Sequence, residues 1–233
     1  MDDRIIGVVG GLSPYSTILY YKFLVEAYRE KRGRDPRILL YSVPVQEMCS
    51  YVKSDNVEGA RRLLSDALRA LSSLGADPII LAANTPHVFL DDETIRESIG
   101  GREFIDIREA VLSKIKSLGV KRIGLLATKA TVEKRLYHDY LEGHGIEVIT
   151  PSRLSQERLD TLIEKLTTGV IPSSEKLTMA TIVSELVGKG AEAILYGCTE
   201  LSLLIGRVSI NKPVIDSLTE HVRYVIDKVT GTQ

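Results

Sequence analysis

The sequence predicts an α/β protein built from two similar halves, and an internal repeat carries this prediction. Three pairs of segments match in the same order, each shifted by a little over a hundred residues: 4–11 with 122–128, 75–85 with 190–200, and 104–107 with 214–217. Each pair contains an apolar run typical of a buried parallel strand. We therefore expect two similar α/β domains, produced by duplication, each with a mainly parallel sheet.

The first half alternates short apolar runs with segments of helical spacing. Gly10 to Pro14 forms a tight turn between the first strand and the first helix, and residues 44–49 read as a loop or a short helix. The expected elements are strands at 5–9, 38–43, 79–83 and 104–107, and helices at 16–30, 56–74 and 108–118.

The second half repeats this order with a longer helical section. The expected strands are 122–127, 146–149, 193–197 and 214–216, and the expected helices pass through 137–140 and cover 155–168, 174–188 and 219–229. Because the last strand and helix match 104–118, the C-terminal segment is expected to return to the first domain. The predicted domains are 1–108 with 210–233, and 109–209.

The composition excludes several classes of protein. The 233 residues are 44% apolar, and the net charge of -1 without a basic cluster argues against nucleic acid or an anionic membrane as partner. No apolar run approaches membrane-spanning length, and the N-terminus lacks a signal sequence, so a cytoplasmic protein is expected. The two cysteines, Cys49 and Cys198, form no disulfide framework, and no Cys or His spacing predicts a metal site.

Polar residues follow two equivalent strands of the repeat. Asn84 and Thr85 follow one, Thr199 follows the other, and Ala83 aligns with Cys198. The carboxyl ends of parallel strands are where such sheets bind ligands. Cys198 can be read as a small apolar core residue or as an acid/base thiol, whose pKa a helix N-terminus or a cation would lower.

Three short motifs resemble those of a known family. Val9 to Pro14 (VGGLSP), Ala83 to His87 (ANTPH) and Gly197 to Glu200 (GCTE) are similar to the three signatures of the aspartate/glutamate racemase superfamily. The resemblance covers essentially the whole chain. It implies two Rossmann-like domains with the site in the cleft between them, no cofactor, and a homodimer that acts on a small amino acid or carboxylic acid.

The resemblance also implies a mechanism, from which this sequence departs at one position. In the family's racemases one thiol removes the α-proton from one face of the amino acid and a second thiol returns a proton to the other. Cys198 keeps one thiol, whereas Ala83 stands where the other is usual. The implied activity is a cofactor-independent amino-acid racemase whose turnover is reduced, one-sided or absent. The alternatives are a single-thiol decarboxylase or isomerase of a small carboxylic acid, and a catalytically silent carboxylate-binding homologue.

The resemblance assigns substrate binding to seven residues: Ser13, Asn84, Thr85, Thr128, Thr131, Gln156 and Thr199. For Thr128 and Thr131, helix capping is the alternative. Gln156 or Arg158 takes the place of a basic residue that grips a second carboxylate in acidic-amino-acid racemases, so a neutral or differently charged substrate is equally compatible.

Overall fold

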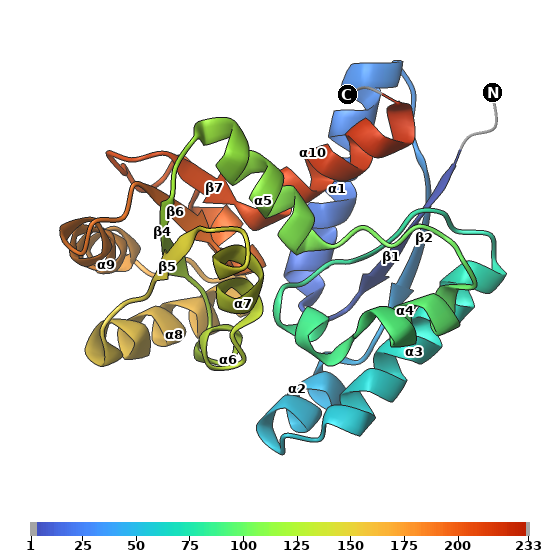
Figure 1. Ribbon diagram of the computed structural model, residues 1–233, viewed down its shortest axis with the longest axis horizontal. Helices are drawn as coiled ribbons and strands as arrows, with labels where there is room; N and C mark the ends of the chain where they lie inside the picture. Colours follow the sequence, from blue (N-terminus) through green and yellow to red (C-terminus); the bar gives the residue numbers. More distant parts are fainter. Residues whose placement is uncertain (1–3, 232–233) are drawn as a thin grey trace. The chain divides into compact units, whose positions relative to one another are not determined.

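The computed structural model describes residues 4–231, which form two compact units. Residues up to Ile107 and from His221 onward make the first unit, and Arg108–Glu220 make the second. Each unit contains its own parallel sheet with helices around it (Figure 1). This confirms the expected pair of α/β domains.

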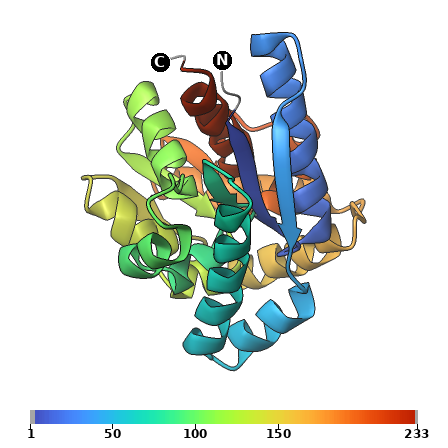
Figure 2. The same cartoon turned by 90° about the vertical axis from the view of Figure 1, so that its right-hand side faces the viewer.

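The first unit is built on a parallel sheet of order β2-β1-β3. Its elements in chain order are β1 (Ile5–Gly10), α1 (Pro14–Arg32), β2 (Arg37–Ser42), α2 (Val45–Lys53), α3 (Val57–Ser73), β3 (Ile79–Leu81), the 3-10 helix η1 (Thr85–Phe89) and α4 (Asp92–Ile99). Figure 2 shows β1 and β2 as neighbouring parallel arrows. The segment 44–49 left open by the sequence begins helix α2.

Local signals place the first helix. Ser13 caps the N-terminus of α1, Pro14 occupies its first turn, and Gly33 ends it in the left-handed conformation, with φ of 68°. Before the helix, Gly11 also has a positive φ of 81°, and a Cβ there would lie 2.1 Å from the Val43 carbonyl oxygen. The tight turn after β1 therefore requires glycine at position 11.

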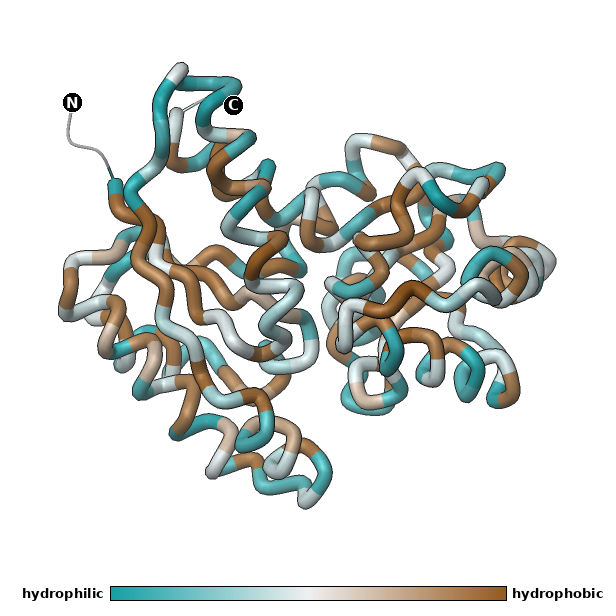
Figure 3. The backbone as a smooth tube through the Cα atoms, turned by 180° about the vertical axis from the view of Figure 1, so that it is seen from behind, coloured by the Kyte–Doolittle hydropathy of each residue, from teal (hydrophilic) through white to brown (hydrophobic). Residues whose placement is uncertain are grey.

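The second unit is built on a parallel sheet of order β5-β4-β6-β7. The elements from residue 107 onward are α5 (Ile107–Leu118), β4 (Arg122–Leu126), α6 (Lys129–Glu133), α7 (Leu136–Glu142), β5 (Glu147–Ile149), α8 (Arg153–Thr167), α9 (Glu175–Gly188), β6 (Ala193–Tyr196), the 3-10 helix η2 (Thr199–Leu204), β7 (Val214–Asp216) and α10 (Ser217–Thr230), whose residues from His221 onward belong to the first unit. The most hydrophobic stretches of backbone run through the strands (Figure 3), and each unit has a separate apolar core.

Two expectations differ from the structure. The predicted strand 104–107 is reduced to a single parallel bridge between Ile79 and Phe104, because the chain enters α5 at Ile107. Residues 210–220, expected in the first domain, group with the second unit, because β7 pairs with β6. The crossing to the first unit therefore occurs inside α10, at His221.

Candidate active site

The carboxyl end of β6 positions Cys198. Gly197 follows the strand, and its N–H donates to the Leu126 carbonyl at 2.8 Å. A Cβ at position 197 would lie 2.7 Å from Leu125 Cδ1, so glycine lets the chain pass close to β4. Cys198 comes next in an extended conformation, precedes η2, and is only 7% exposed.

The Cys198 thiol is hydrogen-bonded to a buried carboxylate. Its Sγ donates to Glu200 Oε2 at 2.9 Å, and the Thr199 hydroxyl donates to the same oxygen at 3.2 Å. Both Thr199 and Glu200 are buried. Sequence analysis did not assign Glu200 a role, although its position two residues after the cysteine was visible.

Burial raises the pKa of the Cys198 thiol well above its usual value, and the negative charge of Glu200 and its hydrogen bond raise that pKa further. This direction is opposite to the lowering of the Cys198 pKa that a helix N-terminus or a cation would cause. The structure instead gives a raised pKa, because burial and the Glu200 and Asp160 carboxylates outweigh the backbone hydrogen bond from Glu200, which lowers the pKa. Cys198 is thus held as a protonated thiol whose Sγ–H is hydrogen-bonded to the Glu200 carboxylate.

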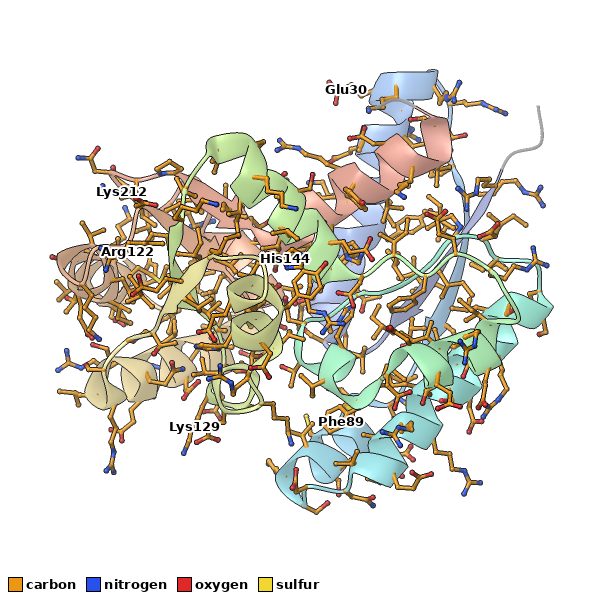
Figure 4. All side chains as sticks on the ribbon, viewed as in Figure 1. Glu30, Phe89, Arg122, Lys129, His144 and Lys212 are labelled. Atoms are coloured by element: carbon orange, nitrogen blue, oxygen red, sulfur yellow. The ribbon has the colours of Figure 1, made fainter. Side chains whose placement is uncertain are left out.

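A second carboxylate, Asp160 of α8, also acts on this part of the second unit. Its Oδ1 accepts the Lys129 backbone N–H at 2.9 Å and Gln156 Nε2 at 3.1 Å; Lys129 is labelled in Figure 4. Its charge adds to the raised pKa of Cys198. Asp160 was missed by sequence analysis, since its only signal was a spacing of four residues from Gln156 on one helix face.

Gln156 and Arg158 take different places in the second unit. Gln156 Nε2 donates to the Ala127 carbonyl at 2.9 Å, so its amide lies at the carboxyl end of β4. Arg158 instead lines a surface pocket between α8 and the start of α9. The structure therefore brings Gln156, and not Arg158, to the strand end.

Thr128 and Thr131 hold the turn after β4. Thr128 caps α6 by accepting the Thr131 N–H at 3.3 Å, and the two hydroxyl oxygens lie 3.0 Å apart. The structure therefore shows helix capping for Thr128, while Thr131 supplies the capped N–H and a hydroxyl that contacts the Thr128 hydroxyl.

Ser13 is likewise a capping residue. Its Oγ accepts the Ser16 N–H at 3.4 Å, and its carbonyl accepts the Thr17 hydroxyl at 2.9 Å. Thr17 Oγ1 in turn accepts the Gly11 N–H at 2.9 Å. Thr17 is not among the residues predicted from the sequence. Its hydroxyl stabilises the glycine turn by accepting the Gly11 N–H.

The equivalent strand end in the first unit carries Ala83. Ala83 follows β3, precedes η1, and is 7% exposed, the same fraction as Cys198. Asn84 is buried beside it, and its carbonyl accepts the His87 N–H at 3.1 Å and lies 3.1 Å from His87 Nδ1. The imidazole is therefore a buried part of this turn, and the position equivalent to the thiol offers only a methyl group.

The described residues contain no cluster of side chains suited to bind a metal ion. Among residues 4–231, no group of three or more His, Cys, Asp or Glu side chains is arranged to hold a metal ion. In the same residues, every helix is too short or too polar to cross a bilayer.

Comparison with known proteins identifies the family. The chain matches the Asp/Glu/Hydantoin racemase family over residues 9–225. It is 24% identical to the broad specificity amino-acid racemase RacX of Bacillus subtilis, an alignment that covers 91% of this chain and 92% of RacX.

Solved structures agree with this assignment. An aspartate racemase homologue from Pyrococcus horikoshii OT3 is 33% identical with a TM-score of 0.83, covering 98% of this chain and 100% of that one. The aspartate racemase of Picrophilus torridus is 25% identical with a TM-score of 0.80, covering 99% and 95%. The chain belongs to the Asp/Glu/hydantoin racemase family.

Proposed function

We propose that the protein is a PLP-independent amino-acid racemase that transfers a proton at the α-carbon of its substrate through Cys198. The observation that carries the proposal is the 2.9 Å hydrogen bond between the buried Cys198 thiol and the Glu200 carboxylate. The family supplies the reaction class, and this pair supplies a proton donor and a proton acceptor in contact.

The pair balances each proton transfer. When Cys198 acts as a base, its own proton passes to Glu200 Oε2 and the sulfur then takes the α-proton, so the carbanion gains the electron pair of the broken C–H bond. In the reverse step the sulfur returns a proton to that carbon and Glu200 returns its proton to the sulfur. The transfer of the proton from Cys198 to Glu200 leaves the total charge of these two side chains at -1. This limits the free-energy cost of forming a buried thiolate.

Substrate contacts complete the proposal. Asn84 and Thr85 follow β3, and Thr199 follows β6, each beside the position of a thiol in the family's racemases. We assign them to the α-carboxylate, as the family resemblance implies. Gln156 at the end of β4 is assigned to the polar part of the substrate.

Ala83 limits the stereochemical outcome. Inversion needs a proton on the face opposite the one from which it was removed, and a methyl group cannot supply it. We therefore expect α-proton exchange with retention to exceed racemisation, and Ala83→Cys to raise the rate at which the opposite enantiomer appears.

A set of matched variants tests this function. Cys198→Ala should abolish α-deuterium incorporation in heavy water, whereas Cys49→Ser removes the exposed thiol and should leave it unchanged. Glu200→Gln keeps the size of the side chain but cannot accept the thiol proton, so exchange should fall by about a hundredfold, within the range of general acid/base effects. Exchange that survives Cys198→Ala would reject the assignment. Binding of amino acids without any exchange would favour the silent carboxylate-binding homologue.

A second candidate is favoured by the protonated state of Cys198. A single thiol with a raised pKa suits decarboxylation of a malonate-like acid, in which the C–C bond breaks, carbon dioxide leaves, and Sγ–H protonates the resulting carbanion. One donor suffices there, so Ala83 is no obstacle. Release of carbon dioxide with an enantiopure product from a prochiral disubstituted malonate would select this function over racemisation.

A further inference from the structure

A pocket in the second unit is lined by positive charge and by no carboxylate. It has a volume of about 160 Å3, enough for several water molecules or a small anion. Its lining residues come from α8 and from the segment that starts α9: Arg158, Thr161, Leu162, Lys165, Pro172, Ser174 and Thr178.

The helical repeat brings the two cations to the same pocket. Arg158 and Lys165 are seven residues apart on α8, close to two turns, and the positions between them in the pocket are Thr161 and Leu162. Both are long side chains, so their charged ends can converge over the space between them.

Neither cation is neutralised within the described chain. Elsewhere on these helices, basic residues pair with an acid four positions away, as Arg153 does with Glu157 at 3.1 Å. The residues three and four positions from Arg158 and Lys165 on α8 are serine, leucine and threonine, and neither cation forms an ion pair with any residue between 4 and 231. Two uncompensated charges at one pocket concentrate anions there.

Hydroxyl groups complete the polar lining. Thr161 Oγ1 donates to the Glu157 carbonyl at 2.9 Å, so its role in the pocket is fixed as an acceptor. Ser174 precedes α9 and makes no side-chain capping bond, and within residues 4–231 Thr178 makes no side-chain hydrogen bond either. These two hydroxyls can donate to an oxyanion held by the cations.

We infer that this pocket binds a small, doubly charged oxyanion of the phosphate type, held by Arg158 and Lys165 and oriented by Ser174 and Thr178. A guanidinium matches two phosphate oxygens at once, and an ammonium adds a point charge. The pocket is distinct from the strand end that carries Cys198, since neither Cys198 nor Glu200 nor Gln156 is among the residues that line it. The inference is therefore independent of the proposed racemase activity.

Calorimetry of the full chain with inorganic phosphate tests the inference. Phosphate should bind saturably, and Arg158→Gln with Lys165→Gln should weaken binding by at least about tenfold, since each cation supplies a charge-assisted hydrogen bond. The double variant Lys116→Gln with Arg207→Gln removes the same charge from exposed positions of the second unit and should bind phosphate as the unmodified chain does.

Two results would overturn the inference. One is equal weakening by both double variants, which would indicate a nonspecific effect of net charge. The other is phosphate binding no stronger than that of chloride at the same ionic strength. Amide chemical shifts recorded during the titration should move at the end of α8 and the start of α9, and shifts confined to other segments would also contradict it.

Discussion

A buried histidine makes the stability of the first unit depend on pH. His221 in α10 is fully buried; Tyr20 Oη donates to its Nδ1 at 3.0 Å, and its Nε2 donates to the Ile105 carbonyl at 3.0 Å. This network joins α1, α10 and the segment beside β3. Burial lowers the pKa of His221 to about 3, with His87 adding to the effect and the Ile105 carbonyl and Asp106 opposing it.

The direction of the effect follows from where the proton binds. In the unfolded chain the pKa of histidine is near 6.5. Between about pH 3 and pH 6.5, His221 is therefore protonated in the unfolded state and neutral in the folded state. Stability from this residue is complete above about pH 6.5 and is lost as the pH falls below it. At pH 5 the loss is about 2 kcal/mol, because the pH is about 1.5 units below the unfolded pKa and each unit costs about 1.4 kcal/mol.

Thermal unfolding of the native chain and of His221→Gln measures this loss. Going from pH 7 to pH 5, the native chain should lose roughly 4–8 °C of Tm more than the variant does, at about 2–4 °C per kcal/mol for a chain of this size. Other titrating groups are common to both proteins and cancel in the comparison. His144→Gln, which changes an exposed histidine, should behave as the native chain. Equal losses for the native chain and His221→Gln would refute the reasoning.

Two further predictions concern the thiol and its strand. Gly197→Ala should destabilise the chain by about 1–3 kcal/mol in urea unfolding, because the added Cβ would overlap Leu125 of β4. The control Gly188→Ala should not destabilise the chain, since a Cβ there has no neighbour within 4 Å. Equal losses of stability in the two variants would contradict the packing argument. In native protein a thiol reagent at pH 8 should modify Cys49 rapidly and Cys198 slowly, because Cys198 is buried and has a raised pKa; Glu200→Gln should speed the modification of Cys198, and an unchanged rate would contradict the role of that carboxylate.

The internal repeat predicted the fold because both halves of the sequence show the same order of apolar runs. It placed Ala83 and Cys198 at equivalent strand ends and located the start of β4 and the break before α9. It predicted the bounds of β7 but assigned this strand to the wrong domain, because the choice between two sheets depends on which edge the strand pairs with. Pairing partners far apart in the chain leave no local signal.

The chemistry of the site was less predictable than its position. Cys198 was identified from its motif, but the direction of its pKa shift depends on burial and on the side-chain conformation of Glu200, two residues away. Asp160 lies on another helix, α8, so its effect on the Cys198 thiol depends on tertiary packing that the sequence does not show. Ser13 and Thr128 cap helices in the structure through local hydrogen bonds three residues along the chain, a role that their residue types allowed.

The measurement that tests the central claim most directly is α-proton exchange. Single-enantiomer amino acids are incubated with the protein in heavy water, and deuterium at the α-carbon and chirality are followed together. The account predicts deuterium incorporation that depends on Cys198, with retention faster than inversion because Ala83 offers no second proton. Exchange of the same size in Cys198→Ala would contradict the claim that this thiol, with Glu200 beside it, carries the proton.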